Sequence, residues 1–331
     1  MQAHIEMGEE MEFLKLDADR EKSIRRRIRL TLHAAVVLAV VCAATFSVAL
    51  AQQKSFSSAE EAVEAAVTAA RNNNEKDMLA IFGAQAKELL FSSDAVADKQ
   101  RREEFLAAYA ESHRLVAEGQ DTILLVGKQD WPFPIPLVKR GNAWVFDTAK
   151  GKEEILNRRI GENELYTIKT LLAVVDAQRE YAMKDRDQNG LLEYAQKFVS
   201  DPGKKDGLYW EVKPGEPPSP LGPIMARARS EGYKGQASIT APPYHGYYYR
   251  ILTAQGKDAP GGAYSYLVNG KMIGGFAVVA YPTEYGNSGV MTFVVNHDGN
   301  VFQKNLGKNT VATGKSMKEY NVDSTWSEVK E

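Results

Sequence analysis

The amino-acid sequence predicts an α+β protein of two modules, each with helices followed by an antiparallel sheet. Helix-period apolar patterns fill residues 57–70 and about 98–117, and strand-like runs follow them. The same order then repeats, beginning with one longer helical pattern from about residue 152 to 184. With 331 residues, 44% of them hydrophobic and 25% charged, the chain has room for one large domain or two of ordinary size.

Residues 1–51 are predicted to be a signal peptide with a long polar lead. The basic stretch RRRIR, residues 25–29, precedes an apolar run over residues 30–51 that ends in Ala-Leu-Ala. This pattern is typical of a secretory signal and predicts cleavage near Ala51. The run is also roughly long enough to span a bilayer, so retention as a membrane anchor is the alternative. We expect a bacterial periplasmic or secreted protein that meets the membrane only through this segment, if it stays uncleaved.

Composition excludes several classes of function. The only cysteine, Cys42, lies in the apolar run, so the processed chain would have no thiolate nucleophile, thiolate metal site or disulfide. The formal net charge is −2, and basic residues are scattered among acidic ones, which argues against a nucleic-acid partner. Three histidines follow the run, and none has the spacing of a zinc motif. Apart from calcium, we expect no cofactor.

The first module is assigned to residues 52–155. Its first helix is predicted to start at Ser57 or Ser58, because Glu60 or Glu61, three residues on, can complete a capping box. A second helix is predicted over about 98–117. The predicted strands cover residues 121–127, 135–140 and 143–149, with a hairpin turn at Gly141 and Asn142.

The second module is assigned to residues 156–310, with 311–331 as a C-terminal tail. Its helix, from about residue 152 to 184, crosses the boundary between the modules, and a continuous helix there would favour rigid docking. Its predicted buried side carries Leu165, Ile168, Leu171, Leu172 and Val175. The strand-like segments that follow an irregular, proline-rich stretch are residues 246–254, 274–282, 290–296 and 301–307.

Each module resembles a known fold. Helices followed by a curled sheet over residues 55–155 resemble the NTF2-like or cystatin-like fold, which often encloses a pocket. The pocket candidates are Trp131, Phe133, Trp144 and Phe146, and ordinary core packing is the alternative. In the second module, ENELYTIKTLLAVVDAQREYA, the DRDQNG loop and TFVVNHDGNVFQKNLG resemble the globular part of type IV pilins and pseudopilins. The long hydrophobic segment that begins a pilin helix is absent here, because this helix is amphipathic and follows another module.

Residues 55–310 as a whole resemble a family of exported bacterial proteins known as a domain of unknown function (DUF2950). The stretches that carry this resemblance are FDTAKGKEEILNRRIGENEL and PYHGYYYRILTAQGKDAPGGAYSYLVNGKMIGGFAVVAYP. The resemblance implies bacterial origin and export. It implies no catalytic residues, because the family has no assigned activity.

A polar loop after the long helix starts like a calcium-binding loop. Asp185, Asp187 and Asn189 occupy the first, third and fifth positions of an EF-hand loop, and Glu193 the ninth. The twelfth position is Gln196, which cannot supply two carboxylate oxygens. Asp185, Asp187, Asn189 and Glu193 are therefore a candidate calcium site. The favoured interpretation is a polar turn that closes the helix, with Asn189 and Gly190 at positive φ.

A tyrosine-rich strand is the candidate partner-binding surface. In PPYHGYYYRIL, Tyr247 and Tyr249 share one side of the strand, and Tyr244 lies just before it. Exposed tyrosines suit contacts with a glycan or a protein, so these three residues are predicted to bind a partner. The alternative is that the strand packs against the long helix.

The function predicted from these observations is a non-catalytic binding or assembly module of the cell envelope. It rests on the export signal, the two compact modules and the lack of a recognisable catalytic constellation. Its partner would be an unidentified envelope protein or glycan. The alternative is an exported hydrolase that uses the carboxylates of Asp185, Asp187 and Glu193 with help from His245.

Overall fold

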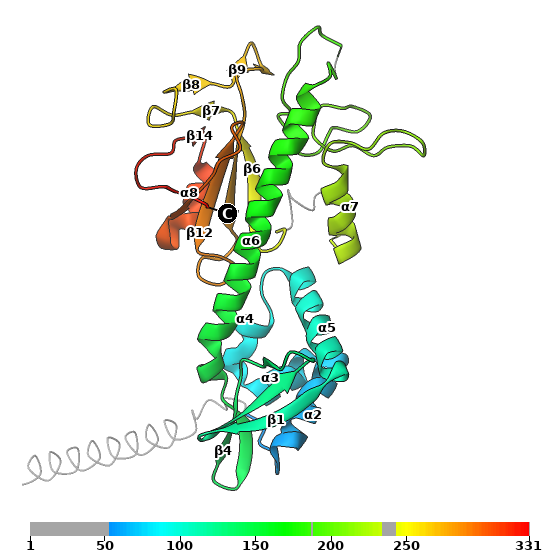
Figure 1. Cartoon of the computed structure of the whole chain (residues 1–331), viewed down its shortest axis with the longest axis vertical. Helices are drawn as coiled ribbons and strands as arrows, with labels where there is room; N and C mark the ends of the chain where they lie inside the picture. Colours follow the sequence, from blue (N-terminus) through cyan, green and yellow to red (C-terminus); the bar gives the residue numbers. More distant parts are fainter. Residues whose placement is uncertain (1–52, 187, 234–242, 331) are drawn as a thin grey trace, which may run out of the picture. The chain divides into compact units, whose positions relative to one another are not determined.

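A computed structural model describes residues 53–186, 188–233 and 243–330. The predicted signal peptide lies outside these residues, and so does Asp187 of the predicted calcium loop. Helices combine with largely antiparallel sheets, so the predicted α+β class is confirmed (Figure 1). Across the described ranges, no helix is both long and apolar enough to cross a membrane.

The first part of the chain folds as short helices around a small sheet. The helices are α2 (Ala59–Arg71), α3 (Glu75–Phe82), α4 (Lys87–Leu90) and α5 (Ala95–Glu111). The strands are β1 (His113–Glu118), β2 (Asp121–Val126), β3 (Trp131–Pro132), β4 (Leu137–Arg140) and β5 (Ala143–Phe146). They pair antiparallel in the order β1-β2-β4-β5, and β3 adds to β2.

Helix α2 begins with the predicted capping box. The Ser58 hydroxyl accepts a hydrogen bond from the backbone N–H of Glu61 at 3.1 Å. The Glu61 carboxylate in turn accepts from the backbone N–H of Ser57 at 2.9 Å and from its hydroxyl at 2.6 Å. These bonds satisfy backbone donors that a helix start leaves free, and they hold the pocket-lining helix in place.

The predicted helix over about 98–117 is wrong at its C-terminal end. Helix α5 ends at Glu111, and Ser112 is extended. Residues 113–118 form β1, which pairs along its whole length with β2. The sheet partner decides the conformation here, because a strand that can pair with a neighbour outweighs a marginal helical pattern.

One uninterrupted helix, α6 (Thr148–Ala182), crosses the predicted module boundary at residue 155. Leu165 is 61% exposed, so its predicted burial is wrong, and Leu172 is also exposed. The buried stripe instead runs through Asn163, Thr167, Thr170, Leu171, Val174, Gln178 and Tyr181. The predicted burial of Leu171 and Val175 is confirmed, and Ile168 is half-buried. Polar positions on the inner face explain why hydrophobic spacing alone misplaced Leu165 and Leu172.

The second part of the chain places α6 against a five-stranded antiparallel sheet (Figure 1). Its strand order is β15 (Ser327–Glu328), β13 (Val301–Asn305), β12 (Met291–Asn296), β11 (Ala277–Pro282) and β6 (Tyr247–Leu252). A smaller sheet joins β14 (Glu319–Tyr320), β7 (Ala254–Gln255) and β8 (Tyr264–Ser265), and β9 (Leu267–Val268) pairs with β10 (Lys271–Met272). The remaining helices are α7 (Gly222–Glu231) and α8 (Thr310–Ser316).

The predicted C-terminal tail, residues 311–331, belongs to this second part. It carries most of α8, together with β14 and β15, and the two strands pair with β7 and β13. Arg250 of β6 donates hydrogen bonds to the carbonyls of Gly314 and Lys315 at 2.9 and 2.5 Å. These contacts fix the segment to the sheet.

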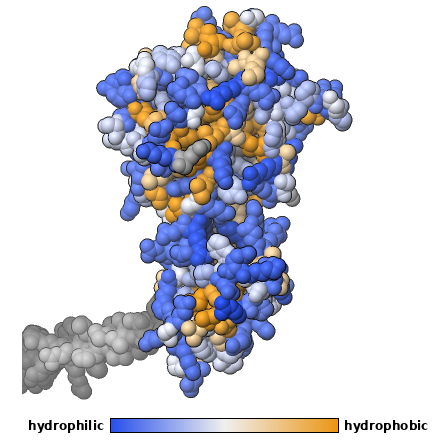
Figure 2. Space-filling model, viewed as in Figure 1, coloured by the Kyte–Doolittle hydropathy of each residue, from blue (hydrophilic) through white to orange (hydrophobic). Residues whose placement is uncertain are grey.

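The buried apolar side chains divide into two clusters. One comprises residues between 56 and 146, and the other residues between 171 and 320. Polar and charged residues cover much of the visible face, and apolar residues gather in a few places (Figure 2). Residues 53–331 form one compact unit, since α6 and several polar contacts join the two clusters.

Candidate functional site

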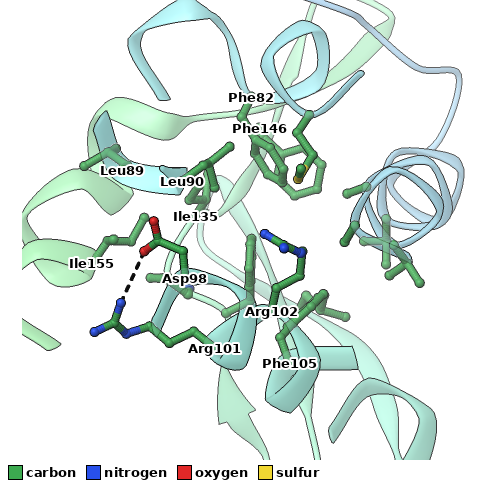
Figure 3. Close-up of a pocket in the computed structure, with 18 of the residues that line it drawn as sticks. Phe82, Leu89, Leu90, Asp98, Arg101, Arg102, Phe105, Ile135, Phe146 and Ile155 are labelled. Atoms are coloured by element: carbon green, nitrogen blue, oxygen red, sulfur yellow. Dashed lines mark hydrogen bonds and ion pairs between the residues drawn. The ribbon is translucent and has the colours of Figure 1, made fainter. Parts of the chain in front are cut away.

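An apolar pocket of about 200 Å³ lies in the first part of the chain, between α2, α3, α5 and the sheet (Figure 3). Fifteen of its nineteen lining residues are apolar: Val63, Ala66, Val67, Ala70, Met78, Phe82, Leu89, Leu90, Phe105, Leu124, Phe133, Pro134, Ile135, Phe146 and Ile155. The other four are Asp98, Arg101, Arg102 and Arg159. The pocket therefore combines an apolar wall with a small charged group.

Four phenylalanines form one aromatic wall of the pocket. The ring centres of Phe82 and Phe146 lie 4.7 Å apart, and those of Phe105 and Phe133 lie 5.2 Å apart. Phe133 lies 6.2 Å from both Phe82 and Phe146, so the rings form one connected group. Such a surface favours an apolar or aromatic ligand.

Of the four aromatic residues predicted to line a pocket, two do so. Phe133 and Phe146 belong to the aromatic wall. Trp144 is half-buried and packs on the same core without lining the cavity, whereas Trp131 is 60% exposed. Strand alternation does not explain this difference, because the members of each pair stand two positions apart and would share one face. Phe133 follows the end of β3, and Trp144 bridges to Phe56.

Asp98 and Arg101 form a closed ion pair at the pocket (Figure 3). Asp98 is buried and accepts hydrogen bonds from the Ser92 backbone N–H and hydroxyl, at 2.5 and 2.9 Å. Arg101 donates to Asp98 at 3.3 Å, to Glu162 at 3.0 Å and to Asn163 at 2.9 Å. Burial raises the pKa of Asp98, and the bonds from Ser92 and the charges of Arg159 and Arg101 oppose that rise. Both charges of the pair are thus already engaged.

Arg159 reaches the pocket from the first half of α6. Its guanidinium donates to the backbone carbonyls of Glu88 and Leu89, at the end of α4, and to the Asn287 side chain. The side chain is buried, and burial lowers its pKa while the charge of Asp98 raises it. Its Nε–H has no hydrogen-bond partner among the described residues. Arg159 thus caps two backbone carbonyls of α4, and its Nε–H stays without an acceptor among the described residues.

Arg102 differs from the other two arginines because its guanidinium has no partner among the described residues. The residue is half-buried. Figure 3 shows its side chain extending from α5 into the space between Phe105 and Phe146, away from the Asp98–Arg101 pair. A guanidinium carries five donors and a permanent charge, so this residue can bind an anion inside an apolar pocket.

The four charged residues that line the pocket were not among the site residues predicted from the sequence. Asp98, Arg102, Phe105 and Tyr109 stand three or four positions apart, so they share one face of α5. This face carries two charged and two aromatic residues, and that pattern could have indicated a site there. The pairing state of each charge depends on the tertiary fold and could not be read from that spacing.

The prediction of an exposed tyrosine surface is wrong. Tyr244, Tyr247 and Tyr249 are 3%, 0% and 4% exposed. The Tyr247 hydroxyl donates to the carbonyl of Met291 at 2.9 Å, and the Tyr249 hydroxyl donates to Thr167 of α6 at 3.3 Å. The side of β6 that carries these residues therefore packs inwards against its own module. The alternative reading of the strand, packing on the long helix, holds for Tyr249.

The predicted calcium loop is held by its own backbone. Asp185 accepts from the backbone N–H groups of Asn189 at 3.1 Å and Gly190 at 2.8 Å. Glu193 accepts from Asn189 at 3.2 Å and from Lys271 at 3.0 Å. No metal-binding group of three such side chains occurs among the described residues, which exclude Asp187. Calcium binding stays a prediction, which thermal melts with calcium and then with a chelator would test.

Of the residues in the hydrolase alternative, Asp185, Glu193 and His245 are described, and the two carboxylates have other partners than the histidine. His245 is buried, stacks on Tyr166 at 4.0 Å and lies 3.2 Å from the Glu231 carboxylate. Neither Asp185 nor Glu193 is among these contacts. Burial lowers the pKa of His245, and Glu231 and Asp94 oppose that effect.

These features define an α+β protein with an apolar pocket in which one arginine, Arg102, has no partner among the described residues. Residues 53–329 match the family model described as a protein of unknown function (DUF2950), and the chain belongs to this family. The searches of curated proteins and of solved structures found no match.

Proposed function

We propose that this chain is a non-catalytic binding protein that holds one small apolar molecule in the pocket beside α5. The observation that supports this most directly is the cavity of about 200 Å³ with apolar residues at fifteen of nineteen lining positions. An engineered apolar cavity of about 150 Å³ stays dry and takes up benzene. A cavity of this size therefore suits a molecule with one ring or a short branched chain.

Among the residues that the structure describes, the pocket has no free acid–base group, and this favours binding over catalysis. Its one carboxylate, Asp98, is paired with Arg101 and bonded to Ser92. The alternative, an exported hydrolase that uses Asp185, Asp187 and Glu193 with His245, has less support, because His245 pairs with Glu231. General acid–base chemistry needs its groups within reach of one substrate atom.

Export belongs to the same proposal. The basic stretch and the apolar run ending at Ala51 support cleavage there and a periplasmic or secreted location. In that setting the protein would act at the cell envelope, with an envelope protein or glycan as a further partner and with no nucleic-acid partner. Its buried tyrosines take no part in that contact.

Filling the pocket tests the function. We expect toluene, a neutral one-ring probe, to raise the melting temperature of the purified chain, because it binds only the folded state. Ala70→Phe places a ring in the cavity from α2 and should remove most of the toluene effect. Ala107→Phe is the matched control, since Ala107 is exposed on α5 and does not line the pocket.

The readout is a thermal melt with and without toluene, supported by titration calorimetry. A wild-type chain that shows no shift and no heat would contradict the proposed function. If Ala70→Phe does not fold, Val63→Phe, about two turns earlier on the same helix, gives an independent filled variant.

A further inference from the structure

The pocket contains one cationic group that the protein itself does not neutralise. Arg101 is held between Asp98 and Glu162, and Arg159 donates to two carbonyls and to Asn287. The guanidinium of Arg102 has no such contact within the described ranges. A half-buried charge among phenylalanines loses part of its hydration without gaining an opposite charge. This desolvation is unfavourable in the free protein, and a bound anion would offset it.

The charged residues that line the pocket carry a net positive charge. Three arginines face one aspartate, and that aspartate is already bonded to Ser92 and Arg101. The buried Nε–H of Arg159 is a second donor with no acceptor in the part of the chain that the structure describes. Buried donors are nearly always satisfied in folded proteins, so an unsatisfied one at a pocket indicates an absent acceptor.

We propose that the ligand of this pocket is a small carboxylate with an aromatic or branched aliphatic body, and that Arg102 binds its carboxylate. This inference rests on the proposed function, because it names the class of molecule that the same pocket takes. A planar carboxylate matches the two parallel donors of a guanidinium. The cavity of about 200 Å³ has room for the body of such a molecule.

The geometry also assigns the two ends of the ligand. The apolar body lies against the wall of Phe82, Phe105, Phe133 and Phe146, and the carboxylate faces Arg102 (Figure 3). Arg102 is half-buried, so this contact is partly shielded from water, which strengthens a charged hydrogen bond relative to one at the surface. The charge then discriminates among ligands that fit the cavity equally well.

Benzoate and its neutral isostere benzamide separate the inference from the proposed function. The purified full chain should bind benzoate at least tenfold more tightly than benzamide at pH 7, a difference of about 1.4 kcal/mol. Arg102→Met replaces the charged side chain by an apolar one of similar length. The variant should therefore still bind benzamide and should lose the preference for benzoate. Arg140→Met, which removes an exposed arginine at the end of β4, is the matched control and should leave both affinities unchanged.

Titration calorimetry with the two probes gives a distinct result for each failure. Equal affinity of the wild type for benzoate and benzamide would overturn the carboxylate inference and leave the pocket function standing. Binding of neither probe, together with no effect of toluene, would overturn both. A thermal melt of Arg102→Met confirms folding, and its melting temperature should be equal to or above that of the wild type, because an unpaired charge has been removed.

Discussion

His245 shows how one residue can combine backbone strain, burial and a titratable group. Its φ of 48° lies in the left-handed region, which is uncommon for residues other than glycine. The next residue, Gly246, also has positive φ and donates its N–H to Asp94 at 3.1 Å. The Asp94 carboxylate also accepts from the Tyr233 hydroxyl at 2.8 Å and from the backbone N–H of Ala97 at 3.0 Å. These bonds hold the turn with the His245 ring buried.

The buried ring predicts a pH dependence of stability. Burial lowers the pKa of His245 below 6.5, so at mildly acidic pH the unfolded chain binds a proton that the folded chain does not. Stability should therefore fall as the pH drops through about 6.5. The groups facing the ring, Glu231, Asp94 and the more distant Glu162, oppose the shift but do not reverse it.

His245→Asn tests this effect, because asparagine tolerates a positive φ and does not titrate. The variant should lose less unfolding free energy between pH 7 and pH 5 than the wild type, although it is less stable at pH 7. Urea denaturation at both pH values measures the difference. The raised pKa of Asp98 acts on both chains equally, so it cancels in the comparison. An identical loss in the two chains would rule out His245 as the source.

At the scale of elements, the correct predictions are those that depend only on residues close together in the sequence. The capping box of α2 was predicted from a serine and a glutamate three positions apart. The Ser58 hydroxyl accepts from the backbone N–H of Glu61, and the Glu61 carboxylate accepts from the backbone N–H of Ser57. The end of α5 was missed because β1 owes its conformation to pairing with β2. The charged part of the pocket was missed for the same kind of reason, since Arg102 and Arg159 come from two helices that only the fold brings together.

Two glycines of α6 provide a matched test of how this helix packs. A Cβ on Gly151 would lie 2.6 Å from the carbonyl oxygen of Pro134 and 2.8 Å from Ile135, both of which line the pocket. A Cβ on Gly161 would meet nothing within 4 Å. Helix propensity alone favours alanine at both positions by roughly 0.5–1 kcal/mol.

Gly161→Ala should therefore stabilise the chain by up to about 1 kcal/mol, whereas Gly151→Ala should destabilise it by about 1–3 kcal/mol through overpacking. Chemical denaturation of the two variants measures both effects. Gly151→Ala should also weaken toluene binding, because Ile135 is displaced. A stabilised Gly151→Ala variant would mean that α6 is not packed tightly against the pocket.

At the scale of the whole molecule, the sequence predicted the α+β class and the family, and it predicted two modules. The buried side chains form two clusters that follow one another along the chain, but residues 53–331 form one compact unit, so the division into two modules stays a prediction. The boundary between modules was the part that periodicity could not place, since α6 continues through residue 155 without a break. A helical pattern gives no indication of which neighbour each turn will contact.

Export is the prediction that belongs to this scale. In bacterial cells that export the protein, the mature chain should begin at Gln52, because the apolar run ends in Ala-Leu-Ala. Intact-mass measurement of the protein from the periplasm or the medium gives the N-terminus directly. A chain that keeps the apolar run and stays with the membrane would show that the segment is an anchor.

The continuity of α6 limits how this protein can be divided for study. Ile155 and Arg159 both line the pocket, yet they lie on opposite sides of the boundary expected between residues 155 and 156. A fragment that stops at that boundary would lose the buried guanidinium, leave the carbonyls at the end of α4 without their donor and open one wall of the cavity. A fragment that starts there would begin with part of a helix whose first turns have no sheet to cover. Ligand binding therefore has to be measured on the undivided chain, and an inactive fragment would say nothing about the pocket.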